Sequence, residues 1–335
     1  MTNIKVSVIL PFRNAASTLA RAIESILEQS FENFELILID DGSKDHSIEI
    51  AMNYNDRRIR NIKHPACGIV FSLNKGILLA RGKYIARMDA DDYSYPDRLL
   101  LQNMCLEEDS DVGVVSGLVN YAGDQKKNRG YKVYVDWINQ LITPQQIYLN
   151  RFVESPLAHP SVMIRKDLFE KYGYYKSGNF PEDYELWLRL MDRGIRFTKL
   201  NNVILDWQDD ENRLSRNHPN YTTDAFFQVK TKYFFSWYQK FFQSYIPPIL
   251  VWGTGKSVLQ KSRFLSEYDL KITGYIDVQD KKDRLVNGYP VFHYQEIPSE
   301  AFILSYVSDR KGRIQIHDFL LRNGFEEGKD FYMMN

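Results

Sequence analysis

Apolar and polar positions follow one another along the first 110 residues in blocks that predict strands and helices in turn. Four short runs predict strands: 5–10, which is apolar and β-branched as buried strands are, and then 34–40, 59–63 and 84–88. Apolar residues recur at helical spacing between these runs, as in 17–29 and 69–80. Four strand–helix alternations predict an α/β domain with a parallel sheet.

The alternation fades after residue 116, and we expect 117–160 to be mixed and loop-rich. Helices are predicted over 144–149, 166–172, 181–193 and 222–245. Pro247-Pro248 breaks the chain, and a new series of strands and helices begins at residue 249. A chain of 335 residues exceeds what one hydrophobic core usually holds. We therefore predict a first domain over 1–246, with a helical tail from about 220, and a smaller α/β domain over 247–335.

The composition limits the classes of function. Lys and Arg total 43 and Asp and Glu total 43, so the formal net charge is zero. Nucleic-acid binding normally needs a basic surface, so we expect no nucleic-acid partner. Cys67 and Cys105 have no metal-binding spacing and predict free thiols in a reducing compartment. No signal peptide or membrane-spanning run is visible, so we expect a cytoplasmic protein, and contact with a membrane surface is left open.

Acidic residues gather where two predicted strands end. Asp40-Asp41-Gly42-Ser43 follows one strand and Asp89-Ala90-Asp91-Asp92 follows another. Ligands of such sheets bind beyond the carboxyl ends of the strands. Crowded carboxylates repel one another, and a hard divalent cation with oxygen ligands relieves the repulsion. Such a cation would bind a diphosphate and help it to leave. The alternative is a polar loop whose Asp side chains cap turns.

A third acidic pair, Glu182-Asp183, stands at a predicted helix start after Pro181. A carboxylate at this position could act as the general base for an acceptor hydroxyl. The alternative is that the two acids only complement the helix dipole, because acids favour first turns.

These motifs, in this order, resemble family 2 glycosyltransferases. The residues that carry the resemblance span about 4–205: 6–14, 40–45, Gly82-Lys83-Tyr84-Ile85, 89–92, Pro96-Asp97-Arg98-Leu99 and 182–189. Segments 137–141, 213–216 and 327–331 resemble a subgroup that carries a C-terminal Rossmann-like domain and includes β-1,3-N-acetylglucosaminyltransferase-like proteins. The resemblance implies a GT-A fold followed by that smaller domain.

The resemblance also implies a chemistry, namely inverting transfer from a UDP-sugar or a related donor with Mn²⁺ or Mg²⁺. By position it implies that Asp91 ligates the metal and that Asp183 is the catalytic base, with Glu182 the next candidate. The residues implied on the donor side are Pro11, Phe12, Asn14, Asp40, Asp41, Asp89, Ala90, Asp91 and Arg213. Arg213 could instead pair with the acids at 209–211. His159 and Trp187 fall on the acceptor side, and a structural role for His159 is the alternative.

Departures from the family refine the hypothesis. The Gln-x-x-Arg-Trp motif of processive synthases and their membrane helices are absent, which favours addition of one sugar per event. Segment 68–76 has Ser72-Leu73-Asn74 where many relatives carry a basic residue. The predicted function is transfer of a single sugar to a glycan or lipid-linked acceptor in surface polysaccharide or glycoconjugate biosynthesis.

The second domain leaves a rival hypothesis open. Gly253-Thr254-Gly255 followed by Asp277 partly fits a dinucleotide site, but Val258 stands where the third glycine would fall. A fold remnant or a module for self-association is the other interpretation of this domain. The rival function is a non-catalytic nucleotide-binding or regulatory protein.

Overall fold

The structure is a computed structural model that describes residues 4–124, 128–209, 218–279, 284–298 and 300–335. The chain divides into two compact units. The first comprises 1–148, 156–178 and 182–218, and the second comprises 149–155, 179–181 and 219–335.

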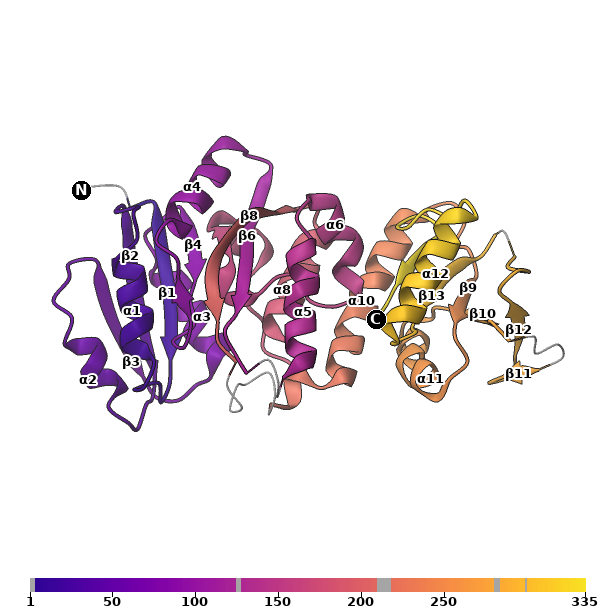
Figure 1. Ribbon diagram of the computed structural model, residues 1–335, viewed down its shortest axis with the longest axis horizontal. Helices are drawn as coiled ribbons and strands as arrows, with labels where there is room; N and C mark the ends of the chain where they lie inside the picture. The colour runs from indigo at the N-terminus through magenta and orange to yellow at the C-terminus, as the bar shows by residue number, and fades with distance from the viewer. Residues whose placement is uncertain (1–3, 125–127, 210–217, 280–283, 299) are drawn as a thin grey trace. The chain divides into compact units, whose positions relative to one another are not determined.

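An eight-stranded mixed sheet with helices around it forms the first unit (Figure 1). The strand order is β3-β2-β1-β4-β7-β6-β8-β5. Its strands are β1 (Val6–Phe12), β2 (Phe34–Asp41), β3 (Ile59–His64), β4 (Tyr84–Arg87), β5 (Tyr93–Ser94), β6 (Val112–Tyr121), β7 (Met163–Arg165) and β8 (Arg196–Trp207). Its helices are α1 (Leu19–Leu27), α2 (Ser47–Met52), α3 (Ile69–Leu79), α4 (Arg98–Glu108), α5 (Arg129–Gln140), α6 (Pro144–Leu149), α7 (Asp167–Tyr172) and α8 (Glu182–Asp192).

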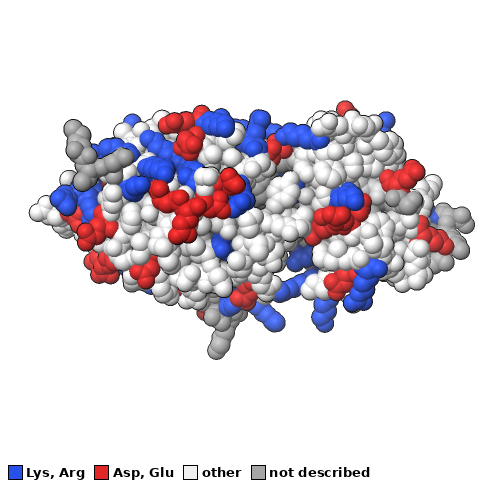
Figure 2. Space-filling model, turned by 90° about the horizontal axis from the view of Figure 1, so that it is seen from above, with Lys and Arg blue, Asp and Glu red and all other residues white. Residues whose placement is uncertain are grey.

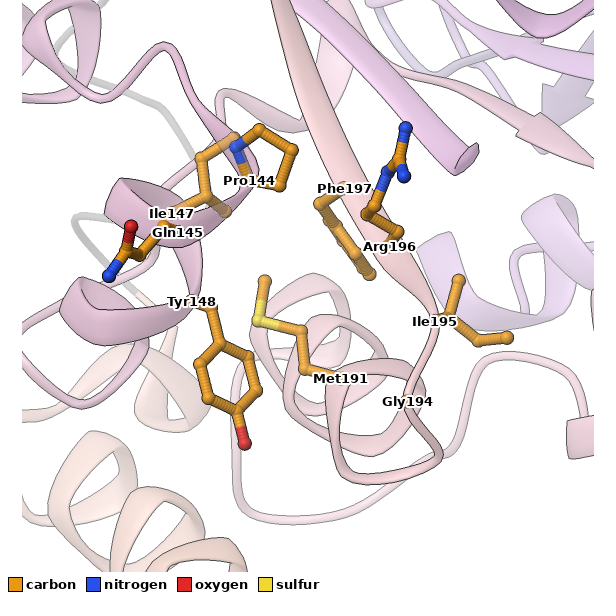
Figure 3. Close-up of a pocket in the computed structure, with 9 residues that line it drawn as sticks. All are labelled: Pro144, Gln145, Ile147, Tyr148, Met191, Gly194, Ile195, Arg196 and Phe197. Carbon is orange, nitrogen blue, oxygen red and sulfur yellow. The ribbon is translucent and has the colours of Figure 1, made fainter. Parts of the chain in front are cut away.

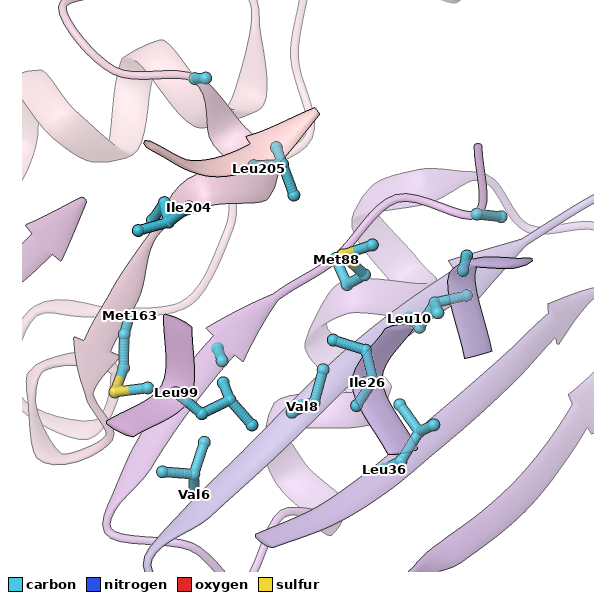
Figure 4. Packing of buried hydrophobic residues seen from close by; sticks show 14 of the residues in the cluster. Val6, Val8, Leu10, Ile26, Leu36, Met88, Leu99, Met163, Ile204 and Leu205 are labelled. Carbon is cyan, nitrogen blue, oxygen red and sulfur yellow. The ribbon is translucent and has the colours of Figure 1, made fainter. Parts of the chain in front are cut away.

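Strand β1 organises this sheet because all seven of its residues are buried. It pairs in parallel with β2, with Phe12 opposite Asp40, and with β4, with Ile9 opposite Arg87. Its side chain Val8 lies in one core cluster with Ile26 of α1 (Figure 4). Burial of each such side chain contributes about 1.5–3 kcal/mol. The parallel register brings the ends of β1, β2 and β4 to one edge, as the alternation predicted.

The expectation of a mixed, loop-rich segment is wrong for the first part of 117–160, whereas the helix predicted over 144–149 is confirmed as α6. This region continues β6 and then forms α5 and α6. Apolar and polar residues do not alternate along β6, because α4 and α5 both contact this strand. Strand β6 pairs in parallel with the twelve-residue β8. Two consecutive asparagines, Asn201 and Asn202, interrupt the apolar run of β8, and the β6–β8 register shifts on either side of Leu118. Such register shifts interrupt the alternation of side chains, so the periodicity of the sequence does not reveal the strand.

The second unit is a smaller Rossmann-like α/β domain, so the predicted fold class is confirmed. Its sheet has the order β11-β12-β10-β9-β13-β14, and β12, β10, β9, β13 and β14 run parallel. The strands are β9 (Ile249–Trp252), β10 (Ile272–Asp277), β11 (Leu285–Val286), β12 (Tyr289–His293), β13 (Phe302–Ser305) and β14 (Phe331–Met333). The helices are α10 (Thr223–Phe241), α11 (Lys256–Ser262) and α12 (Arg310–Arg322).

Helix α10 belongs to the second unit, whereas we expected it to end the first domain at residue 246. Its aromatic side chains pack on β13 and β14. The ring centroids of Trp237 and Tyr332 are 4.8 Å apart, and those of Tyr238 and Phe302 are 5.2 Å apart. Aromatic packing of this kind stabilises a contact beyond the effect of the apolar area that the rings bury. Helix α10 therefore lies on the second unit's side of the boundary at 218/219.

The surface carries both signs of charge. Figure 2 shows basic and acidic side chains interspersed over the face that it displays. This distribution agrees with the zero net charge of the sequence. Of the helices within the described ranges, none has both the length and the apolar character needed to cross a membrane.

A glycine beside β1 provides a test of this packing. A Cβ on Gly82 would lie 2.5 Å from the Ser7 amide nitrogen and 2.7 Å from the Val6 carbonyl carbon. Gly82→Ala should therefore lower the free energy of unfolding by about 1–3 kcal/mol, measured by urea denaturation. Gly130→Ala in α5 is the control, because its Cβ meets nothing within 4 Å, and it should stabilise the protein by about 0.5–1 kcal/mol. Equal stability of the two variants would contradict this packing.

Candidate active site

The carboxyl ends of β1 and β2 are joined by a small hydrogen-bond network. Asp40 is fully buried, and its Oδ1 accepts from the Ser43 amide at 2.8 Å. The Asn14 amide donates to Ser43 Oγ at 3.0 Å, and Asn14 Oδ1 accepts from the Lys44 amide at 2.8 Å. Asn14 adopts a φ of 52°, a left-handed conformation that asparagine tolerates. The network fixes the loops that follow Phe12 and Asp41.

Asp41 is held by the turn that leads into α3. Its Oδ1 accepts from the Cys67 amide at 2.7 Å, and both oxygens lie 3.1 Å from the Gly68 amide nitrogen. The neighbouring Gly42 has a φ of 72°, and a Cβ there would lie 2.7 Å from the Ala66 amide nitrogen. Only glycine suits both constraints. The carboxylate of Asp41 is therefore fixed at the edge of the sheet.

The loop after β4 brings three carboxylates together. One oxygen from each of Asp89, Asp91 and Asp92 can be chosen so that all lie within 4.8 Å of one another. Asp92 is 1% exposed and accepts from the Gln208 amide at 2.8 Å. Three carboxylate oxygens at this separation are the donor set that Mg²⁺ or Mn²⁺ prefers. The residues present therefore fit a divalent cation.

Two buried arginines brace this acidic loop, and the sequence analysis did not identify either as a site residue. Arg87, at the end of β4, is 4% exposed and donates from Nη2 to Asp89 Oδ1 at 2.5 Å. Arg98, at the start of α4, is 1% exposed and donates from Nη2 to the Arg87 carbonyl at 2.6 Å. Burial lowers the pKa of Arg98 to about 9. A charged residue inside the apolar run 84–88 was the signal that could have identified Arg87.

The predicted base lies at the start of α8. Glu182 is 5% exposed, and Asp183 accepts from the Tyr184 amide at 2.7 Å. Burial and the neighbouring charge of Glu182 raise the pKa of Asp183 to about 7, although that amide and the charge of Arg87 act in the opposite direction. A carboxylate with a pKa near neutrality is suited to accept a proton.

His159 and Trp187 lie beneath this helix start. His159 is 8% exposed, and its Nε2 lies 2.8 Å from the hydroxyl of Tyr175. Trp187 is 0% exposed, with its ring edge-to-face against His159 at 5.9 Å between centroids. Both side chains pack within the protein. Burial, and then the charge of Arg87, hold the pKa of His159 well below its usual value, so its ring is neutral near pH 7.

The loop that carries Tyr175 is anchored at several points. Asn74 of α3 donates to the Tyr175 carbonyl at 2.9 Å and accepts from its amide at 3.0 Å. Arg189 of α8 donates to the carbonyls of Tyr172, Gly173 and Tyr174 at 2.5–2.7 Å. The structural task of Asn74 is therefore to hold the backbone of this loop at Tyr175.

The remaining predicted residues are either buried or not described. Pro11, Phe12 and Ala90 are buried at the strand edge. Arg213 lies outside the described residues. The structure thus brings the residues at 11–14, 40–41 and 89–92 to one edge of the first unit.

A cavity of about 310 Å³ lies at the other end of α8 and contains none of the predicted site residues (Figure 3). Its lining is mainly apolar and comes from α6, the end of α8 and the start of β8: Pro144, Gln145, Ile147, Tyr148, Met191, Gly194, Ile195, Arg196 and Phe197. It is therefore distinct from the acidic edge.

Comparisons with known proteins agree with this geometry. Residues 7–173 match the model of glycosyl transferase family 2. EpsE of Bacillus subtilis (strain 168), named as a glycosyltransferase, is 33% identical over 228 residues, which cover 66% of this chain and 78% of EpsE. The chain belongs to glycosyltransferase family 2. The predicted family is thereby confirmed, and with it the glycosyltransferase class of enzyme.

Two further comparisons extend this result. The O-antigen biosynthesis glycosyltransferase WbnJ of Escherichia coli is 30% identical over 212 residues, which cover 61% of this family 2 chain and 79% of WbnJ. The crystal structure of S. aureus TarS 1–349 in complex with UDP-GlcNAc superposes with a TM-score of 0.53 at 17% identity, covering 79% of this chain and 71% of that one. The likeness to TarS shows the fold.

The raised pKa of Asp183 predicts a cost in stability. Because the folded-state pKa is near 7 and the ordinary value is 3.8, the ionised form disfavours folding, and this cost grows as pH rises between those values. Asp183→Asn should therefore raise the free energy of unfolding by more than about 1 kcal/mol at about pH 8, since one unit of pKa difference corresponds to about 1.4 kcal/mol. Urea denaturation at about pH 4 is the internal control, where the gain should vanish. A gain that is equal at both pH values would be inconsistent with a carboxylate that ionises near neutrality in the folded protein.

Proposed function

We propose that this family 2 enzyme is a divalent-metal-dependent, inverting glycosyltransferase that moves one sugar from a UDP-sugar to a hydroxyl of a glycan or lipid-linked acceptor. The observation that carries the proposal is the meeting of three carboxylates within 4.8 Å at the edge that also holds Asp41. The UDP-GlcNAc bound by TarS supports a UDP-sugar donor, and the name of WbnJ supports a role in polysaccharide biosynthesis. Cys67 and Cys105 are free thiols, which supports a reducing, cytoplasmic setting.

The donor is held at the edge formed by β1, β2 and β4. We assign the nucleoside to the sheet edge that carries Pro11, Phe12, Asn14, Asp40 and Asp41, with Asp41 on the side of the base. Asp91, together with Asp89 and Asp92, would ligate Mn²⁺ or Mg²⁺. When bound, such an ion neutralises the diphosphate and makes it a better leaving group.

The proton transfer is assigned to Asp183. Its carboxylate takes the proton of the acceptor hydroxyl while that oxygen forms a bond to the anomeric carbon of the donor sugar. The bond from that carbon to the nucleotide diphosphate breaks on the opposite face, and its electron pair leaves with the diphosphate. Attack opposite the leaving group inverts the anomeric configuration. Glu182 supports this role because its charge helps to make Asp183 a stronger base.

The rival function, nucleotide binding by the second unit without catalysis, has weaker support. The hydroxyl of Thr254 donates to the carboxylate of Asp277, the residue that a dinucleotide site would need for the ribose. The glycine turn therefore already forms a hydrogen bond with the carboxylate that the ribose of a dinucleotide would need. Tight binding of NAD without any turnover of UDP-sugars would favour the rival instead.

Metal dependence is tested on Asp91. The purified protein should release UDP from at least one of UDP-Glc, UDP-Gal, UDP-GlcNAc and UDP-GalNAc when Mn²⁺ or Mg²⁺ is present, and EDTA should abolish the release. Asp91→Asn should lower kcat/KM at least about a hundredfold, because the ion provides several kcal/mol of charge stabilisation. Asp111→Asn is the matched control, since that side chain is 78% exposed and lies outside the site. Full activity of Asp91→Asn, or turnover in EDTA, would refute metal dependence.

The base is tested by pH. Because Asp183 must be ionised to accept the proton, kcat should fall about tenfold per unit as pH drops below about 7. Asp183→Asn should lower kcat about 10²–10⁴-fold and remove this acid limb from the residual rate. Initial rates at saturating donor and acceptor, measured across pH, give both results. A wild-type rate that is constant down to about pH 5 would exclude Asp183 as the base.

A further inference from the structure

His64 ends strand β3 beside the carboxylate that we assign to the side of the base. The parallel register of β2 and β3 places it opposite Asp41, and paired residues of parallel strands point to the same side of the sheet. Nδ1 of His64 lies 3.5 Å from Asp41 Oδ1, and both side chains are only 9% exposed. The proposed mechanism leaves this buried histidine without a role.

The neighbours of the His64 ring determine where its hydrogen lies. Nδ1 faces two acceptors, the Pro65 carbonyl at 2.7 Å and the carboxylate of Asp41. A ring nitrogen between two acceptors must carry a hydrogen, so Nδ1 donates to the Pro65 carbonyl. Nε2 lies 3.2 Å from the hydroxyl of Ser72 in the first turn of α3, and that hydroxyl donates to the ring when the ring is neutral. Both nitrogens of the ring therefore have partners within the protein.

The His64 ring holds the same turn that binds Asp41. The two amides that donate to Asp41 belong to the turn 65–68. His64 binds this turn at its first carbonyl. Ser72, the second partner of the ring, lies 3.2 Å from the carbonyl of Gly68, where the turn ends. The ring thus holds the turn at its beginning and, through Ser72, at its end, so the direction of the Asp41 carboxylate depends on it.

One oxygen of Asp41 retains capacity for a ligand. Oδ1 accepts from the Cys67 and Gly68 amides at 2.7 and 3.1 Å, whereas among the described residues Oδ2 accepts only from the Gly68 amide, at 3.1 Å. A carboxylate oxygen has two lone pairs, so Oδ2 can accept one further donor. An ionised carboxylate fits the N3–H of uracil and repels N3 of cytosine, which is an acceptor at the same place. Such a choice between bases requires that the direction of Oδ2 is fixed.

We propose that His64 is a positioning residue for selection of the nucleobase, because it fixes the turn 65–68 and thereby directs Asp41 Oδ2 toward the N3–H of uracil. The inference rests on the proposed function, in which Asp41 lies on the side of the base. His64 touches no substrate in this assignment and acts through Asp41. The donor is then a uridine nucleotide rather than a cytidine nucleotide, and the selection depends on a residue of β3.

The affinities of UDP and CDP, measured by calorimetry with Mn²⁺, test this role, since the two bases are alike in size and differ at N3. The wild-type protein should bind UDP at least about tenfold more tightly than CDP. His64→Leu keeps bulk against Phe71, whose ring centroid is 4.8 Å away, but removes both nitrogens, so this preference should fall at least about fivefold. Inorganic pyrophosphate with Mn²⁺ has no base, and its affinity should stay within about twofold.

Two further variants separate the two nitrogens of the ring. His64→Asn keeps a donor at the position of Nδ1, so the preference for UDP should stay within about twofold of the wild-type value. His64→Gln reaches toward Ser72 instead and should lose the preference as His64→Leu does. His64→Gln also replaces His64→Leu should the latter not fold. An equal loss of preference in His64→Asn and His64→Leu would overturn the assignment to the Nδ1 donor.

The matched control is His46→Leu, the same exchange at an exposed histidine that forms no side-chain bond at the start of α2, and it should change none of these affinities. A lower unfolding temperature of His64→Leu with an unchanged preference for UDP would show a purely structural histidine and overturn the proposal. Asp41→Asn distinguishes this failure from that of the proposed function. If Asp41→Asn leaves the preference unchanged, the assignment of the nucleoside to this edge fails. If Asp41→Asn lowers the preference and His64→Leu does not, only the role of His64 fails.

Discussion

Repulsion among Asp89, Asp91 and Asp92 is the constraint on which the rest of the site depends. Carboxylates within 4.8 Å of one another stabilise no fold by themselves, so the protein must counter their charge. It does so from below with Arg87 and Arg98, both buried beneath the loop. From outside, a divalent cation and its diphosphate complete the balance in the proposed reaction. In that proposed reaction, the charge balance of the loop is complete only when the cation is bound.

The parallel register of β1 determines where this loop lies. Phe12 stands opposite Asp40 and Ile9 opposite Arg87, so the loops that follow three strands open at the same edge. The edge that we assign to the nucleoside and the acidic loop are both positioned by backbone pairing of β1, whose residues are all buried. The base, in contrast, comes from α8, which follows a long loop and is positioned by side-chain contacts with Asn74, Arg189 and Tyr175. In the proposed function, donor binding therefore rests on the sheet, and activation of the acceptor rests on the loop before α8.

The sequence predicted the first half of the fold well because local periodicity and global topology agree there. Strands β1, β2 and β4 are short and buried, β3 is short and only partly buried, helices separate the four strands, and the motifs at 40–41 and 89–92 lie at the ends of β2 and β4. The prediction failed for β6 and β8, because bulges and polar residues interrupt their pattern and because their pairing is non-local. It also assigned α10 to the wrong unit, since the aromatic partners of that helix, Phe302 and Tyr332, lie far along the chain. Arg87 escaped notice because its importance arises from burial and from neighbours on other elements.

The anchored loop before α8 has a consequence for which of its positions tolerate substitution. Its root is fixed by hydrogen bonds to main-chain atoms of residues 172–175, and these bonds do not depend on the side chains of that segment. The two residues that follow, Lys176 and Ser177, are exposed. The side chains at this tip can therefore be exchanged while the main-chain bonds of the root keep the start of α8 in place.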